Sequence, residues 1–144
     1  MSLTFRTAKQ IRPAELKTLL QQEAHNVQVV DVRDTDFSGG HIKGALNRPV
    51  DLFEDIDDVD QFIKTLASQG KQKVVFHCML SQVRGPMCAQ RFLSRAPVVA
   101  ESEGTSPPEV YVLQGGFKGW AQAIAGDAEL QQLTEEFVSY DYDD

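Results

Sequence analysis

Short apolar stretches alternate along this chain with longer stretches in which apolar residues recur every three or four positions. The apolar stretches at residues 27–32, 73–77 and 110–113 are too short for helices and too continuous for half-exposed strands. This pattern predicts strands that are covered on both faces of a sheet. Two further strands are expected at residues 3–6 and 45–48.

Helices are predicted between these strands, because the intervening apolar residues have helical spacing. The first begins near Pro13, a residue that suits the first turn of a helix. The second covers residues 55–70 and carries acidic residues in its first turn. Two more are expected at residues 85–95 and 117–126. The segment 97–109 is rich in Pro, Ser and Glu and is predicted to be a loop.

Strands that alternate with helices favour right-handed crossovers within one parallel sheet. We therefore expect an α/β fold of three layers, in which an open, parallel, five-stranded sheet has helices on both faces. Residues 1–144 are predicted to form a single domain, with residues 138–144 as an acidic tail. In such sheets the functional site lies beyond the carboxyl ends of the strands.

Composition and charge restrict the kinds of partner. Hydrophobic residues make up 42% of the chain and charged residues 24%, the balance of an ordinary soluble protein. No apolar run approaches the roughly 18 residues of a membrane span, and the N-terminus lacks a signal-peptide pattern. We expect a cytosolic protein, or a nuclear one by diffusion, without a membrane partner. The net charge of −7 argues against nucleic acid, and two cysteines fit a reducing compartment.

The segment VVFHCMLSQVRGP, residues 74–86, places Cys78 directly after a predicted buried strand and Arg84 at the start of a helix. A cysteine is a good nucleophile only as a thiolate. The helix start and the curling loop amides favour a negative charge there. Ser81 supplies a hydroxyl that can donate to the sulfur, and the planar guanidinium of Arg84 matches two oxygens of an oxyanion.

This loop predicts nucleophilic attack by Cys78 on a tetrahedral anion such as phosphate, sulfate or arsenate. The candidate oxyanion ligands are the backbone amides of Met79, Leu80, Ser81, Gln82, Val83 and Arg84.

Other interpretations of these residues stay open at this point. A free cysteine such as Cys78 is often an inert core residue. A zinc site would have His77, Cys78 and Cys88, but it lacks knuckle spacing and a fourth ligand, so no metal is expected. On a strand, His77 points away from the next residue, and we expect it to be a hydrogen-bonded scaffold residue.

Three motifs in these segments resemble those of rhodanese domains, in the order in which that family has them. VVDVRDTDFSGGHIKGALNRP resembles the first rhodanese-homology motif, and VYVLQGGFKGW is similar to the closing motif. VVFHCMLSQVRGP resembles the active-site loop of the rhodanese-fold M-phase inducer phosphatases and of the related eukaryotic arsenate reductases.

The resemblance implies that Cys78 is the nucleophile and Arg84 the oxyanion clamp, while Asp31 and Arg33 brace the loops. Sulfurtransferases of this fold typically have a loop one residue shorter. Five residues between Cys78 and Arg84 imply a cradle for phosphate or arsenate instead.

By resemblance, the chain is expected to be a cysteine-dependent phosphatase that forms a phosphocysteine. Its substrate would be a phosphotyrosine or dual-specificity protein substrate, or a small phosphoester. The alternative is an arsenate reductase that uses the same cysteine, with glutathione or glutaredoxin as the reductant. A sulfurtransferase or an inactive phosphate-binding module is the third hypothesis. No bound cofactor is expected.

This chain departs from the M-phase inducer phosphatases at two places. Those enzymes carry loop glutamates where this chain has Met79 and Val83, so no loop carboxylate is present to protonate a leaving group. They also have a second cysteine where this chain has Val32, and Cys88 is either a substitute for it or a packed residue. The candidate general acids are Asp34, Asp36, Glu101 and Glu103.

Overall fold

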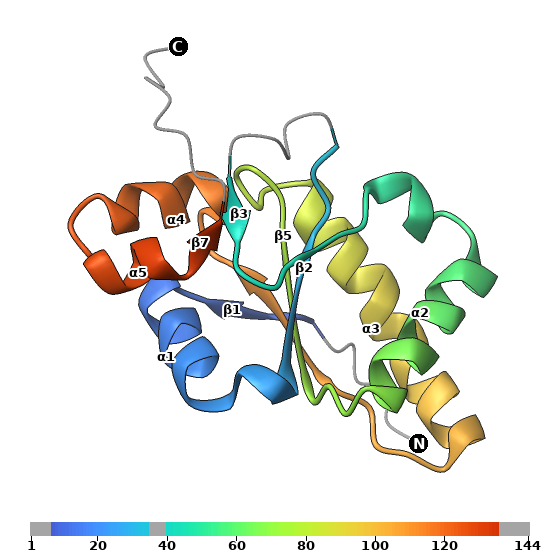
Figure 1. Cartoon of the computed structure of the whole chain (residues 1–144). Coiled ribbons are helices and arrows are strands. Elements are labelled where there is room, and N and C mark those ends of the chain that lie inside the picture. The colour runs from blue at the N-terminus through green and yellow to red at the C-terminus, as the bar shows by residue number, and fades with distance from the viewer. Residues whose placement is uncertain (1–6, 35–39, 136–144) are drawn as a thin grey trace.

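Five parallel strands form the central sheet of this protein, in the order β1-β6-β5-β2-β4 (Figure 1). The structure, a computed structural model, describes residues 7–34 and 40–135. The predicted open, parallel, five-stranded sheet is confirmed. The strands are β1 (Lys9–Ile11), β2 (Val27–Asp31), β4 (Leu46–Asn47), β5 (Lys73–His77) and β6 (Glu109–Leu113).

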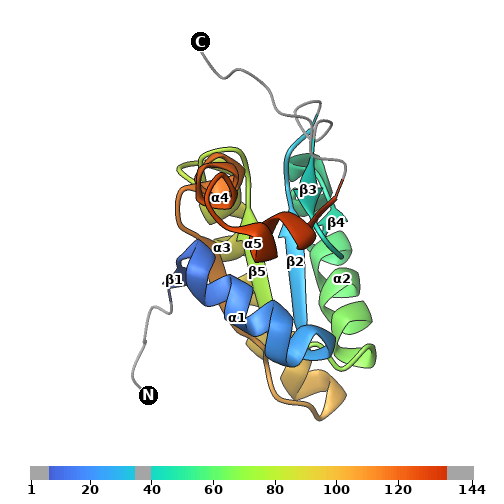
Figure 2. The ribbon, with the colours of Figure 1, turned by 60° about the vertical axis from the view of Figure 1, so that its left-hand side comes forward.

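Helices cover both faces of the sheet, which confirms the three-layer arrangement (Figures 1 and 2). One face carries α1 (Pro13–Glu23), α4 (Gly116–Ile124) and α5 (Ala128–Gln132), and the other carries α2 (Ile56–Ser68) and α3 (Arg84–Glu103). The described residues also include the short 3-10 helices η1 (Ala24–Asn26) and η3 (Val50–Phe53), and β3 (His41–Ile42) pairs antiparallel with β7 (Thr134–Glu135).

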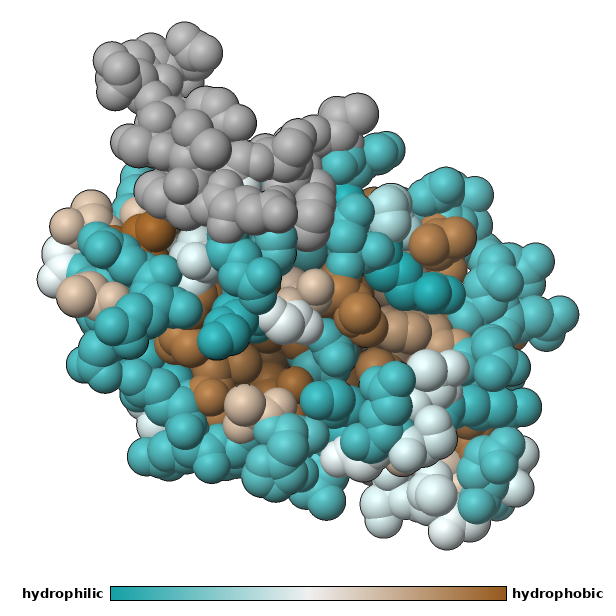
Figure 3. Space-filling view, in the orientation of Figure 1, coloured by the Kyte–Doolittle hydropathy of each residue, from teal (hydrophilic) through white to brown (hydrophobic). Residues whose placement is uncertain are grey.

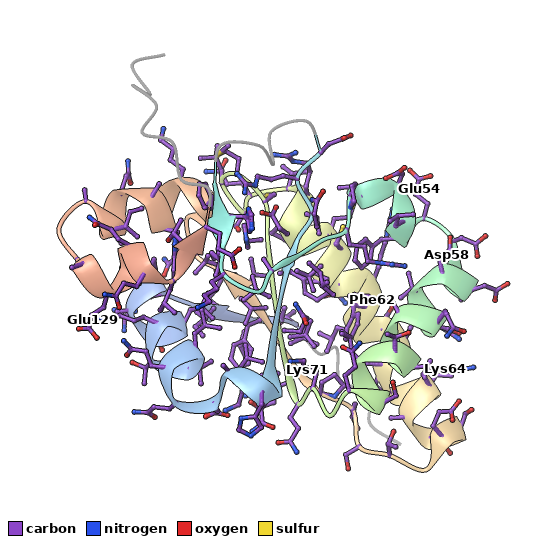
Figure 4. The ribbon with its side chains drawn as sticks, viewed as in Figure 1. Glu54, Asp58, Phe62, Lys64, Lys71 and Glu129 are labelled. Atoms are coloured by element: carbon purple, nitrogen blue, oxygen red, sulfur yellow. The ribbon has the colours of Figure 1, made fainter. Side chains whose placement is uncertain are left out.

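Side chains of the central strand β5 alternate between two apolar cores. Val74 and Phe76 belong to the core under α2 and α3, whereas Val75 belongs to the core under α1 and α4. Figure 4 shows Phe62 directed from α2 toward the interior, where its ring lies edge-on to Phe53 and Phe92. The alternation therefore determines on which side of the sheet each residue at the end of β5 lies.

The start of α2 follows from local chemistry. Asp55 is its N-cap and accepts a hydrogen bond from the amide of Asp57 at 2.8 Å. Asp57 and Asp58 then add negative charge where the helix dipole favours it. The predicted acidic first turn of this helix is confirmed.

The predicted loop at residues 97–109 is wrong over its first half, because α3 continues to Glu103. Pro97 has no N–H to donate within the helix. Ala96, Val99 and Ala100 are nonetheless buried on the face that packs on the sheet. Their burial outweighs the one missing hydrogen bond.

Two predicted segments, the strand at residues 3–6 and the acidic tail at 138–144, lie outside the described residues. The first strand of the described chain is β1, at Lys9–Ile11. Among the described helices none has both the length and the apolarity that crossing a bilayer requires. Figure 3 shows hydrophilic residues over most of one face, with hydrophobic ones reaching the surface mainly near its centre.

Candidate active site

The candidate site lies where the middle strand of the sheet ends and α3 begins. Cys78 follows β5 directly and is 3% exposed. A Cβ atom on Gly85 would lie 3.2 Å from the backbone nitrogen of Cys78, so the helix start presses on the strand end. Only a glycine at position 85 allows this close approach without displacing backbone.

Two backbone amides donate hydrogen bonds to the sulfur of Cys78. They belong to Ser81, at 3.1 Å, and to Gly85, at 3.3 Å. Amide donors and a helix N-terminus both favour a negative charge on the sulfur. The Ser81 amide was predicted as an oxyanion ligand, whereas the Gly85 amide was expected only as part of a helix start that favours negative charge; its bond to the sulfur was not predicted.

Helix α4 holds the opposite side of the loop. The amide of Phe117 donates to the carbonyl of Cys78 at 2.9 Å, and the amide of Lys118 donates to the carbonyl of Met79 at 2.9 Å. Since the peptide bonds are trans, the amides of Met79 and Leu80 point away from α4. The Gly-Gly turn before α4 was visible in the sequence, but its contact with the loop was not predicted.

A buried charge pair lies beneath this loop. Asp31 accepts hydrogen bonds from Arg33 Nε at 3.0 Å and from Arg33 Nη2 at 2.7 Å, and both side chains are buried. Arg33 Nη2 also donates to the Gly40 carbonyl at 2.8 Å. The Arg33 guanidinium carbon lies 4.2 Å from the centre of the Phe117 ring. The pair thus connects the segment after β2 to the start of α4.

His77 joins the same group from the end of β5. Its Nε2 atom lies 3.6 Å from Asp31 Oδ2, and its ring stacks on Phe117 with centroids 6.4 Å apart. Complete burial lowers the pKa of His77, against the opposing effect of the Asp31 charge. His77 Nδ1 lies 3.1 Å from the Cys78 carbonyl, and since a carbonyl only accepts, Nδ1 carries the proton.

The remaining loop residues take different positions. Met79 packs against the α1–α4 core, and Arg84 is the half-buried first residue of α3. The others reach solvent: Leu80, Gln82 and Val83 are exposed.

Cys88 lies one turn into α3 and is fully buried in the core that also contains Cys78. Burial raises the pKa of the Cys88 thiol to about 12. It therefore stays protonated at neutral pH, which favours the packed interpretation over a resolving thiolate.

Two of the four candidate general acids are too far away. Glu101 and Glu103 lie in the last turn of α3, about 25–29 Å along the helix axis from its start. Asp34 follows β2 at the carboxyl edge of the sheet and is exposed, and Asp36 lies outside the described residues. Over residues 7–34 and 40–135 there is no cluster of three His, Cys, Asp or Glu side chains able to hold a metal.

Fold and site together define a class of α/β protein in which a cysteine and an amide-rich loop follow the middle strand of a parallel sheet. Within that class, this chain belongs to the rhodanese-like family, whose domain model matches residues 12–123.

Individual relatives are similar over most of their length. The dual specificity phosphatase ibp1 of Schizosaccharomyces pombe is 34% identical over 137 residues, covering 86% of this chain and 96% of the relative. The crystal structure of Saccharomyces cerevisiae Ygr203w, described as a homolog of single-domain rhodanese and of the Cdc25 phosphatase catalytic domain, has a TM-score of 0.75 at 33% identity, covering 95% and 93% of the two chains. The As-Sb reductase from Leishmania major also has a TM-score of 0.75, at 30% identity, covering 88% and 84%.

Proposed function

We propose that this protein is a cysteine-dependent phosphatase in which Cys78 is the nucleophile and Arg84 the oxyanion clamp. The observation that carries the proposal is the pair of amide hydrogen bonds to the Cys78 sulfur, at the N-terminus of a 20-residue helix. The thiolate is the form of this cysteine that attacks phosphorus, and the two amides point at its sulfur.

The reaction has two displacement steps. The Cys78 thiolate attacks phosphorus, the P–O ester bond breaks, and the alcohol or phenol leaves after taking up a proton. Water then attacks the phosphocysteine, the S–P bond breaks, and inorganic phosphate leaves with the thiolate restored. The loop amides and Arg84 bind the oxygens on which charge collects in both transition states. Asp34 is an exposed carboxyl group that follows β2 at this edge of the sheet, and it is proposed as the proton donor.

Three buried side chains act through the loop and not on the substrate. His77 donates to the Cys78 carbonyl, Asp31 holds Arg33 through their ion pair, and the Arg33 guanidinium lies over the Phe117 ring. Because these groups are packed and hydrogen-bonded, the loop is held in one conformation before the substrate arrives.

Arsenate reduction is the second candidate, supported by the similarity to the As-Sb reductase. Here the Cys78 thiolate would attack arsenic and displace hydroxide. Glutathione or glutaredoxin would then attack the Cys78 sulfur, so that a mixed disulfide forms and arsenic takes up two electrons and leaves as arsenite. A second thiol would restore Cys78. We propose that the protein needs no resident cofactor for either reaction, and that it acts in the reducing cytosol or, by diffusion, in the nucleus.

One experiment separates these functions. Wild type and Cys78→Ser are assayed side by side for phosphate release from an aryl phosphate, for glutathione-dependent arsenite production and for sulfur transfer from thiosulfate to cyanide. We expect wild type to release phosphate and Cys78→Ser to release none. Arsenite production alone would select the second candidate, and sulfur transfer alone would move the protein to the sulfurtransferases. Phosphate binding without any of the three reactions would make the chain a binding module.

A further inference from the structure

Ser81 has an unusual backbone conformation for its residue type. Its φ angle is +54°, and it is the one residue other than glycine with a positive φ in the described chain. The left-handed region is unfavourable for a side chain with a Cβ atom, and such strain concentrates at functional sites. A glycine at this position would adopt the same backbone without that strain.

The Ser81 hydroxyl has a second unfavourable feature. Its oxygen is buried, and within the described part of the chain it has no hydrogen-bond partner. A buried hydroxyl without a partner destabilises a fold, because its hydrogen bonds to water are lost and not replaced. An alanine would remove this penalty.

The loop sequence suggested that the Ser81 hydroxyl donates to the Cys78 sulfur. In the structure it does not. The contact from Ser81 to the sulfur is made by its backbone amide, at 3.1 Å. Since three covalent bonds separate the amide nitrogen from the hydroxyl oxygen, the two lie within about 4 Å of each other. The unpartnered hydroxyl therefore belongs to the residue whose amide contacts the sulfur, in the loop that is proposed to bind the anion.

We propose that the Ser81 side chain is a direct substrate ligand, whose hydroxyl donates to a non-bridging oxygen of the phosphate or arsenate in the loop. This inference rests on the proposed oxyanion chemistry and adds a side-chain donor to the backbone amides. The anion supplies the partner that the hydroxyl lacks among the described residues of the free protein. A strained backbone and an unmatched donor thus occur together at one residue of the proposed anion-binding loop.

The test is the equilibrium affinity for inorganic phosphate, measured by calorimetry on wild type, Ser81→Ala and Ser81→Gly. Alanine removes the hydroxyl, and glycine removes both the hydroxyl and the strain. We expect both variants to bind phosphate about tenfold more weakly, the loss of one hydrogen bond to a charged group. Ser94→Ala is the matched control, since its exposed hydroxyl donates to the Arg91 carbonyl on α3, away from the loop.

A second readout separates this role from an effect on the sulfur. Because backbone amides hold the sulfur, the rate of Cys78 alkylation by iodoacetamide without phosphate should stay within about twofold of wild type in Ser81→Ala. A large change in that rate would assign the hydroxyl to the sulfur and overturn the proposal.

The binding outcomes are each decisive. Equal affinity in wild type and Ser81→Ala would overturn the substrate-ligand role while leaving the phosphatase proposal intact, and so would a loss confined to Ser81→Gly, which reports loop loosening. Absence of phosphate binding in wild type would overturn both together.

Discussion

The backbone amide of Phe117 donates to the carbonyl of Cys78 at 2.9 Å, although the two residues lie far apart in the sequence. The start of α4 therefore fixes the first peptide of the candidate catalytic loop. Gly116 makes this contact possible, because a Cβ atom there would lie 2.5 Å from the carbonyl oxygen of Met79.

Gly116→Ala should therefore destabilise the protein strongly. The alanine would need a φ of +60° and would also collide with loop backbone. We expect a loss of about 3 kcal/mol or more in the free energy of unfolding, measured with urea. Gly104→Ala separates the two causes, since Gly104 has a similar φ of +69° with nothing within 4 Å. It should lose only about 1–2 kcal/mol, and equal losses would show that the collision does not matter.

Gly85→Ala should impair catalysis more than folding. The added Cβ would displace the start of α3 from Cys78 by a few tenths of an ångström and weaken the Gly85 amide contact to the sulfur. We expect kcat/KM for an aryl phosphate to fall about tenfold or more, with slower alkylation of Cys78 at neutral pH. Gly126→Ala, which has nothing within 4 Å, should behave as wild type. An unchanged kcat/KM in Gly85→Ala would contradict the role of that amide.

Breaking the buried Asp31–Arg33 pair should be costly. Asp31→Asn leaves the Arg33 guanidinium buried without its counter-charge, and we expect about 3–5 kcal/mol less stability toward urea. The double change of Asp31→Leu with Arg33→Met should recover much of this, because no charge is then left unpaired. For comparison, Asp60→Asn breaks the part-exposed pair with Arg95 and should lose about 1 kcal/mol or less.

The lowered pKa of His77 predicts a loss of stability on mild acidification. The unfolded chain takes up a proton on His77 near pH 6.5, whereas the folded chain, with its lower pKa, does not. The contribution of neutral His77 to the free energy of unfolding is therefore complete above about pH 6.5. Below that pH it falls by up to about 1.4 kcal/mol per pH unit. His77→Asn keeps a donor for the Cys78 carbonyl but does not titrate. Its free energy of unfolding should change less between pH 7.5 and 5.5 than that of wild type, while a change at the exposed His25 should leave the wild-type drop in place.

Cys88 should be unreactive in the folded protein. With a pKa raised to about 12 and no exposure, it remains a protonated thiol at pH 8. Folded Cys78→Ser should take up no iodoacetamide within the time that labels wild type, and urea should release the second site. Cys88→Ala should keep phosphatase activity and lose about 1 kcal/mol of stability. Rapid labelling of folded Cys78→Ser would reopen a redox role for Cys88.

Much of this fold could be predicted from local patterns in the sequence. The continuous apolar residues of β2 and β5 and the periodic face of α2 depend on neighbours a few positions away. The Asp55 cap and the five-residue spacing from Cys78 to Arg84 are equally local. These features are encoded within one element and one loop, so they could be predicted from the sequence alone.

Contacts between distant segments were decided by packing. The full length of α3 past Pro97 depends on burial of Val99 and Ala100, which no local pattern could weigh against a proline. Because α3 is this long, Glu101 lies at its far end, distant from the site.

The sequence by itself thus determined where strands and helices alternate along the chain. It also placed the cysteine at the carboxyl edge of the sheet. Only the tertiary structure decided that α4 holds the loop carbonyls and that Asp31, Arg33 and His77 are buried together. It also decided that the Ser81 hydroxyl has no partner among residues 7–34 and 40–135. The physical reason is that hydrogen bonding and desolvation at one residue depend on which distant groups are packed around it.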